Sequence, residues 1–279
     1  MRWTPGGSRD NIEDRRGSGG FGGRGVPLGI GGTIVVALLS IIFGQDFFAL
    51  LGDGSGTSAP VAEDSAQRAQ EEPKVEFVTF VLNDVQATWK GIFDTQGRAY
   101  RDARLVLFRD GVQSACGSAG AETGPFYCPA DQKAYIDLSF FDELDRRFGA
   151  PGDFAQAYVL AHEIGHHVQN LLGIEQQVRR AQPGGRAGNA MSVRMELQAD
   201  CFAGVWGYSA AKRDKLDPGD VDEGLGAAAA IGDDRLQKMS RGQVVPESFT
   251  HGSSAQRVQW FRRGLESGQM KDCDTFAAQ

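Results

Sequence analysis

The apolar positions of the chain follow a helical period over most of its length. From residue 153 onward, apolar residues recur at steps of three and four, the spacing of one face of an α-helix. The pattern predicts helices over 75–93, 153–172, 190–211, 219–239 and 253–267. It also predicts a strand over 103–110 and a strand running into a short helix over 133–144. The predicted fold class is therefore α+β, mainly helical with a small β-sheet.

The most apolar stretch, "VPLGIGGTIVVALLSIIFG", occupies residues 26–44 and contains no charged residue. Its length is close to the ~20 residues of a membrane-spanning helix. Residues 1–25 are rich in Gly, Arg and Asp and are predicted to be a disordered tail. Residues 45–73 read as a flexible acidic linker, which leaves 74–279 as the folded domain. The pattern favours a single transmembrane helix; a buried core helix and a cleaved signal peptide are the alternatives.

The charges that flank the apolar stretch predict its orientation. No basic residue follows it until Arg68, whereas several acidic residues come sooner. The arginines that precede it are Arg2, Arg9, Arg15, Arg16 and Arg24. By the positive-inside rule the tail is cytoplasmic and the folded domain lies outside the cytoplasm. We therefore expect a single-pass protein of the cell membrane.

Composition narrows the choice of partners and compartment. The net charge of -7 and the scattered lysines exclude a nucleic-acid partner, which requires a basic surface. The cysteines are even in number, and Cys116 and Cys128 bracket a turn-rich loop, which leaves Cys201 and Cys273. Export favours disulfides over four reduced thiols, although the sequence leaves three possible pairings open.

The candidate chemistry lies in "AYVLAHEIGHHVQNLLG", residues 157–173, which holds three of the four histidines. His162 and His166 are four residues apart, so on a helix their side chains lie next to each other. Two such imidazoles can bind one metal, and Glu163 can reach a water on that metal. This arrangement is typical of zinc hydrolases with a glutamate general base. His167 is expected to pack or cap locally.

A catalytic zinc site needs a third protein ligand, and the segment "SVRMELQADCFAGVWGYSA" offers two carboxylates. Glu196 and Asp200 lie four residues apart beside an apolar stripe, where unpaired carboxylates would be costly. A metal and its histidines would neutralise them. We expect Glu196 to be the third ligand and Asp200 to accept a hydrogen bond from a ligand histidine. The rival ligands are Asp200 itself, Glu175 and Glu223.

Peptide hydrolysis would also need a donor for the developing oxyanion. His251, the one histidine outside the motif, precedes the last predicted helix and is the candidate. Tyr135 and Tyr158 are alternative donors, and a local helix cap is the alternative role for His251. The strand "KAYIDLS", residues 133–139, can present an edge to an extended peptide or can be a plain core strand.

Three blocks carry a family resemblance: "GPFYCPADQKAYIDLSFFDEL", "YVLAHEIGHHVQNLLGI" and "ELQADCFAGVWGYSA". They resemble the gluzincin metallopeptidases and, more narrowly, the YpfJ-like bacterial neutral zinc metallopeptidases, over about residues 75–276. The resemblance implies a zincin-like peptidase domain with its active-site helix on a small sheet, acting on peptide or protein substrates. It implies zinc ligands at His162, His166 and Glu196, and a general base at Glu163.

The expected function is that of a membrane-anchored, zinc-dependent endopeptidase. One alternative is a membrane-tethered scaffold that zinc stabilises and that does not catalyse a reaction. The intact Glu163 counts against it, because a scaffold needs no general base. The other alternative is a zinc amidase that acts on cell-wall peptides, with the same ligands and a different pocket.

Overall fold

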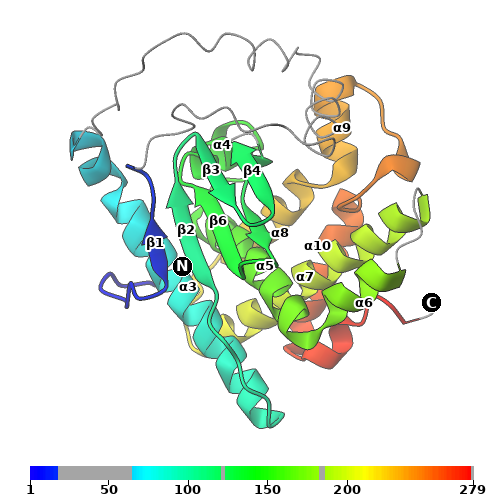
Figure 1. Ribbon diagram of the computed structural model, residues 1–279, viewed down its shortest axis with the longest axis horizontal. Coiled ribbons are helices and arrows are strands. Elements are labelled where there is room, and N and C mark those ends of the chain that lie inside the picture. Colours follow the sequence, from blue (N-terminus) through cyan, green and yellow to red (C-terminus); the bar gives the residue numbers. More distant parts are fainter. Residues whose placement is uncertain (18–64, 121–122, 182–185, 278–279) are drawn as a thin grey trace.

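The computed structural model describes residues 1–17, 65–120, 123–181 and 186–277. These residues form a mainly helical α+β fold with small sheets, which confirms the predicted class (Figure 1). In chain order the elements are β1 (Ile12–Asp14), α3 (Ser65–Thr95), β2 (Arg104–Phe108), β3 (Gly111–Ser114), β4 (Gly117–Gly120), β5 (Phe126–Cys128), β6 (Lys133–Asp137), α4 (Phe140–Arg146), α5 (Asp153–Leu172), α6 (Ile174–Ala181), α7 (Arg186–Lys212), α8 (Asp220–Ala230), α9 (Asp233–Arg241), η2 (Pro246–Ser248), α10 (Ser254–Ser267) and η3 (Met270–Cys273).

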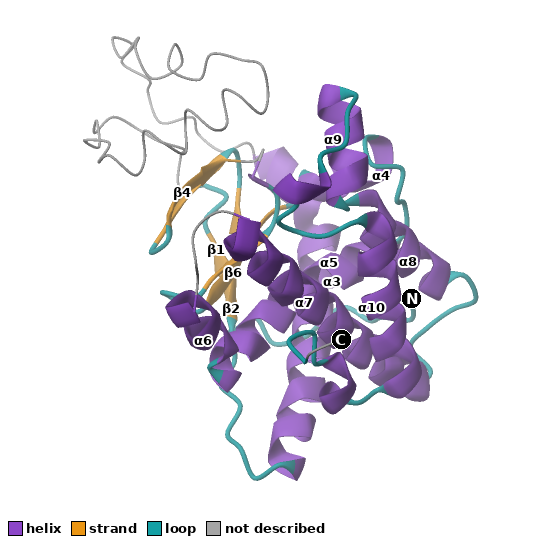
Figure 2. Ribbon diagram, turned by 90° about the vertical axis from the view of Figure 1, so that its right-hand side faces the viewer, coloured by secondary structure: helices purple, strands orange, loops and turns teal. Residues whose placement is uncertain are grey.

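The main sheet has the strand order β1-β2-β6-β5, with β1, β2 and β6 parallel and β5 antiparallel to β6. One face of the sheet, which includes Leu105 and Ile136, belongs to the same core as α3 and α5. The other face, which includes Val106 and Tyr135, packs under the β3–β4 hairpin. Strand β2 is thus buried on both faces, which explains its unbroken apolar run. Most of the helices lie to one side of the strands (Figure 2).

The helix predictions hold best where the apolar period is regular. Helix α5 has the predicted bounds and ends at Gly173, which adopts the left-handed conformation with φ 76°. The helix predicted over 219–239 is instead two helices, α8 and α9. The helical conformation is interrupted at Gly232. A Cβ atom at this position would lie 2.3 Å from the backbone nitrogen of Ser254. The β3–β4 hairpin, β5 and α6 were not predicted.

The N-terminal predictions need correction. Helix α3 begins at Ser65, so residues 65–73 are helical and not part of a flexible linker. The disorder predicted over 1–25 is wrong for residues 1–17, which contribute β1 to the main sheet. The predicted span 26–44 lies outside the described residues. Among the helices that the structure does describe, none has both the length and the apolar composition needed to cross a membrane.

Both disulfide bonds join cysteines that the sequence analysis had grouped. Cys116 pairs with Cys128, which closes the segment between β3 and β5. Cys201 pairs with Cys273, which ties η3 to α7. Of the three possible pairings, this one is therefore confirmed.

Helices α5, α7 and α10 cross with their backbones in contact. A Cβ atom on Gly165 of α5 would lie 2.9 Å from the carbonyl oxygen of Ala199 in α7. On the other side of α7, a Cβ atom on Gly264 of α10 would lie 2.0 Å from the carbonyl oxygen of Cys201. Only glycine allows such close approach. The segment of α7 that carries Asp200 is thereby fixed between α5 and α10.

Alanine at position 264 should therefore destabilise the protein. The added methyl group has no room unless α7 and α10 separate, and overpacking of this kind costs about 1–3 kcal/mol. Gly91, exposed within α3, is the matched control, because a Cβ atom there meets nothing within 4 Å. Gly91→Ala should stabilise the fold by up to about 1 kcal/mol. Urea unfolding with intact disulfides measures both. Equal or greater stability of Gly264→Ala would contradict the close crossing.

Candidate metal centre

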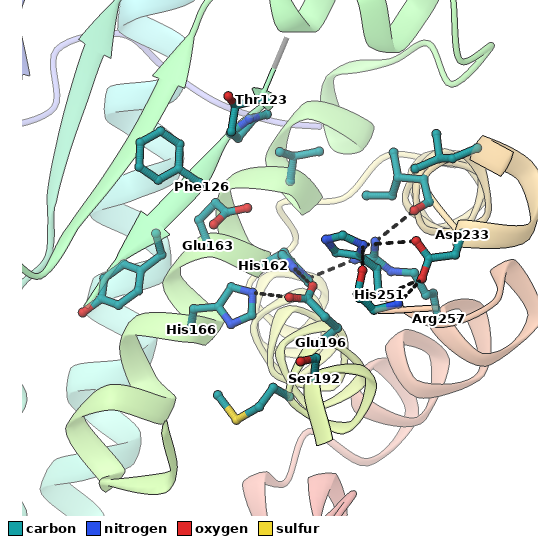
Figure 3. A pocket seen from close by; sticks show the side chains of 18 of the residues that line it. Thr123, Phe126, His162, Glu163, His166, Ser192, Glu196, Asp233, His251 and Arg257 are labelled. Atoms are coloured by element: carbon teal, nitrogen blue, oxygen red, sulfur yellow. Dashed lines mark hydrogen bonds and ion pairs between the residues drawn. The ribbon is translucent and has the colours of Figure 1, made fainter. Parts of the chain in front are cut away.

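Helices α5 and α7 bring together the three predicted metal ligands. The Nε2 atom of His162 lies 3.2 Å from Oε2 of Glu196, and the Nε2 atom of His166 lies 3.5 Å from Oε1 of Glu196. The donor atoms of all three side chains lie within 4.8 Å of one another. Figure 3 shows them gathered in one pocket. Two imidazoles and one carboxylate are the donor set of several catalytic zinc sites.

The other ring nitrogen of each histidine has its own hydrogen-bond acceptor. Nδ1 of His162 donates to Oδ1 of Asp200 over 2.8 Å, since an ionised carboxylate only accepts. Nδ1 of His166 donates to Oε1 of Gln169 over 2.9 Å. The amide of Gln169 is oriented in turn by donating to the carbonyl of Met195. Both Nε2 lone pairs are thus left for a metal, so the site fits zinc.

Gln169 was missed by the sequence analysis. It lies three residues after His166 on the same helix, which places it within reach of that ring. The three-residue spacing could therefore have identified Gln169, although many glutamines at this spacing do not contact the histidine. The predicted position of Asp200 beside a ligand histidine agrees with the geometry.

Asp200 is completely buried, and its charge is balanced mainly by Arg257 of α10. The guanidinium donates from Nε to Oδ2 and from Nη2 to Oδ1, each over 2.8 Å. The hydroxyl of Tyr158 also donates to Asp200. We had expected the metal and its histidines to neutralise both carboxylates, but for Asp200 a buried arginine does most of this. Arg257 was missed, although it shares the inner face of its helix with Trp260, Phe261 and Gly264.

The carboxylates change the protonation of the histidines. Burial would lower the pKa of His162, but Asp200 and Glu196 outweigh it and raise this pKa to about 10. Burial would raise the pKa of Glu196, yet His166 and His162 hold this pKa well below its usual range. Without a metal, the site therefore pairs protonated histidine with ionised carboxylate. A divalent cation can take the place of the histidine protons.

Glu163 does not bind the histidines and lines the same pocket. Its side chain is buried, and this burial raises the pKa of Glu163 against the opposing charges of His162 and His166. In Figure 3 Glu163 extends from α5 into the pocket beside His162. A carboxylate with a raised pKa at this place can accept a proton from a nearby water.

His167 holds the sheet edge against the motif helix. Its Nε2 donates to the carbonyl of Arg101 over 2.6 Å, so its Nδ1 accepts from the hydroxyl of Tyr127 over 2.9 Å. Asn170 donates to the same hydroxyl oxygen. His167 thus packs locally, as expected, and fixes β5 relative to α5.

The pocket is a cleft of about 1620 Å³. Residues 118–120 and 123–127 line one part of it, and α9 with the segment up to His251 lines another. The edge strand that borders this cleft is β5, because β6 lies between β2 and β5 in the sheet. Of the two alternatives for residues 133–139, the edge strand is therefore wrong and the core strand is confirmed.

His251 lies in the cleft and is held by Asp233 of α9. Its Nδ1 lies 3.1 Å from Oδ1 of Asp233, whose other oxygen accepts backbone N–H bonds from residues 250–252. Burial would lower the pKa of His251, but Asp233 and Glu196 raise it. A protonated imidazole at this place can donate to an oxygen in the cleft.

The rival candidates are engaged elsewhere. The hydroxyl of Tyr135 donates to Asp131, and that of the fully buried Tyr158 donates to Asp200. Glu175 lines the cleft but pairs with Arg179 one turn along its helix. Glu223 accepts the backbone N–H of Phe154, at the far end of α5 from the motif. None of the four takes part in the cluster of possible ligands around His162.

Comparison with known proteins shows the family to which the chain belongs. The family described as "Putative neutral zinc metallopeptidase" matches residues 1–276. The chain belongs to this family. YpfJ from Escherichia coli strain K12 is 47% identical over 288 residues, which cover 99% of each chain. Mb2605 from Mycobacterium bovis is 46% identical over 207 residues, which cover 70% of this chain and 68% of that protein. No solved structure matches the chain.

The family description supports a zinc peptidase in general terms. Both relatives are themselves named as uncharacterized proteins, so they add no reaction or substrate.

Zinc affinity should increase with pH. At pH 7 the metal-free His162, with a pKa of about 10, carries a proton that zinc must displace. Glu196 stays ionised over this pH range, so it contributes nothing to the dependence of zinc affinity on pH. We expect the apparent affinity to rise by at least about tenfold per pH unit from pH 6 to pH 8, because one proton or more is released. Competition with a chelator measures it, and an affinity that does not vary with pH would contradict this charge arrangement.

Proposed function

We propose that the protein is a zinc-dependent endopeptidase in which His162, His166 and Glu196 bind the metal and Glu163 is the general base. The observation that carries the proposal is the direction of the two Nε2 atoms. Asp200 and Gln169 occupy the Nδ1 atoms, and both Nε2 atoms face Glu196. Glu163 borders the same cleft.

The chain's own residues account for the proton movements. A zinc ion held here would supply the Lewis acidity that polarises a peptide carbonyl and lowers the pKa of a water toward ~7. Glu163 accepts the proton of the attacking water and delivers it to the leaving nitrogen. Its low exposure keeps bulk water from competing for that proton.

His251 and Asp233 support the same reaction. The raised pKa of His251 favours the protonated ring, which donates a hydrogen bond to the oxyanion as it develops. Asp233 is the positioning residue, because it holds both the ring and the backbone of residues 250–252.

The size and edge of the cleft favour a peptide substrate. Its volume of about 1620 Å³ exceeds the ~300–1,000 Å³ of typical small-molecule pockets. Strand β5 borders the cleft as the edge of the sheet, and an extended peptide can pair with such an edge through its backbone. Three contacts fix β5: Phe126 stacks on Tyr135, Tyr127 binds His167, and Cys128 forms a disulfide.

We further propose that the enzyme acts outside the cytoplasm. Two disulfides in one domain are typical of oxidising compartments and rare in the cytosol. Attachment to the membrane through residues 26–44 is part of this proposal and rests on the apolar sequence alone. The acidic net charge supports protein or peptide partners over nucleic acids.

Glu163→Gln should separate metal binding from catalysis. The amide cannot accept the proton, so peptide cleavage should fall by ~10²–10⁴-fold, whereas zinc content and melting temperature should remain near those of the unsubstituted protein. Glu175→Gln is the matched control, because Glu175 lines the cleft but pairs with Arg179. It should cleave normally. A proteome-derived peptide library with and without chelator gives the rates.

Two outcomes of that experiment would contradict the proposed peptidase mechanism. Cleavage by a zinc-loaded Glu163→Gln at the full rate would exclude Glu163 as the base. Zinc-loaded unsubstituted protein that cleaves no library peptide would favour the scaffold, or the amidase if cell-wall peptides are hydrolysed instead.

Asp233→Asn should shift the pH dependence of cleavage. Loss of the carboxylate lowers the pKa of His251, so the protonated ring is lost at a lower pH and the alkaline limit of activity moves down. Asp234→Asn is the control, because Asp234 binds Ser254 instead. Its profile should match that of the unsubstituted enzyme. An unchanged alkaline limit in Asp233→Asn would argue against a catalytic His251.

A further inference from the structure

The first seventeen residues are built into the same body as the metal centre. Strand β1 extends the main sheet, with Ile12 opposite Leu105 and Asp14 opposite Leu107. The pairing continues at both ends of the strand, where Leu105 N–H donates to the carbonyl of Asn11 and Arg15 N–H donates to the carbonyl of Leu107, each over 2.8 Å. The segment is therefore part of the sheet itself.

The residues before β1 pack along α3. The ring of Trp3 meets that of Phe77 edge-on at a centroid distance of 5.4 Å. At Gly7 a Cβ atom would lie 2.6 Å from the side-chain nitrogen of Asn83, which donates to the carbonyl of Ser8 over 2.8 Å. Met1 is buried in the main core. These contacts bury apolar surface and leave no room for an intervening layer.

The arginines that suggested a cytoplasmic tail have acidic partners instead. Arg2 pairs with Asp217 over 2.8 Å, and Arg9 pairs with Glu72 and Glu76 of α3. These partners belong to the body of the protein.

Arg16 is the strongest case, because its side chain is only 3% exposed. It pairs with Asp14 over 2.7 Å and with Glu71 of α3 over 2.8 Å. Arg15 binds its neighbour Glu13. Of the five arginines behind the orientation argument, four are thus used in ion pairs of the folded structure, and Arg24 lies outside the described residues. The charge pattern that predicted orientation is explained by folding.

A single-pass arrangement would place a hydrocarbon layer of ~30 Å between partners that lie within 3 Å of each other. We propose that residues 1–17 and the metallopeptidase body, residues 65–277, occupy the same compartment. This proposal replaces both the single crossing and the cytoplasmic N-terminus expected from the sequence; the proposed attachment through residues 26–44 is then contact with one side of the membrane. The family match starts at residue 1 and so includes this segment. The inference does not depend on the proposed peptidase activity.

Cysteine labelling of the full-length protein tests the proposal. Thr4→Cys marks the N-terminal segment and Arg262→Cys marks the body; both positions are exposed. A membrane-impermeant maleimide is added to spheroplasts before or after permeabilisation. The unsubstituted chain is the control, since both cysteine pairs are disulfide-bonded.

We expect both positions to be labelled before permeabilisation. Labelling of both only afterwards would also support a shared compartment, but would place it in the cytoplasm. Labelling of Arg262→Cys before and Thr4→Cys only after permeabilisation would overturn the proposal.

A double-mutant cycle on the purified full-length protein independently tests whether residues 1–17 pack on the body. Arg16→Gln and Glu71→Gln should each lower the melting temperature, and the double variant should lose less than the two shifts added together. Melting temperatures unchanged by Arg16→Gln would overturn the docking. Lys90→Gln is the control, because Lys90 forms an exposed pair with Asp94, and exposed pairs contribute little to stability.

Discussion

The candidate metal centre depends on how closely α7 can approach α5 and α10. Gly165 lies between His162 and His166 in sequence and faces the backbone of Ala199, between Glu196 and Asp200. Any side chain at position 165 would push the carboxylates away from the imidazoles. A catalytic metal needs its ligands placed to within tenths of an ångström. A contact between backbones provides this more rigidly than side-chain packing would.

The same crossing explains why a buried carboxylate is tolerated. Asp200 would be costly in a dry interior, but Gly204 and Gly264 bring α10 close enough for Arg257 to bind it with two hydrogen bonds. Asp200 can then accept from His162 without carrying an unbalanced charge. The arginine thus acts on His162 through Asp200. Cys201 follows Asp200 directly in α7, and its disulfide bond with Cys273 holds η3 against α7.

Local sequence was sufficient for the elements that carry the chemistry. The spacing of His162, Glu163 and His166 fixes their relation on one helix, and α5 has the predicted bounds. Glu196 followed from the cost of burying a carboxylate. Gln169 and Arg257 were harder, because polar residues on helices are common and only the packing of α5, α7 and α10 shows which ones turn inward. The edge position of β5 depends on strand order, which no local pattern encodes.

The N-terminal segment shows the opposite case. Its composition is that of a disordered tail, and its strand is only three residues long. What orders it is a set of partners 55 to 215 residues away in sequence, including Glu71, Leu105 and Asp217. Three of the arginines that suggested a membrane orientation, Arg2, Arg9 and Arg16, form ion pairs with residues far away in the chain.

The central claim is that two imidazoles and one carboxylate from α5 and α7 hold a single zinc ion. X-ray absorption spectroscopy of the zinc-loaded full-length protein tests it most directly. We expect a zinc shell of nitrogen and oxygen at about 2.0–2.2 Å that contains two imidazoles and no sulfur. In His166→Ala, one imidazole should be lost from that shell. A sulfur ligand, or a spectrum that His166→Ala leaves unchanged, would contradict the claim.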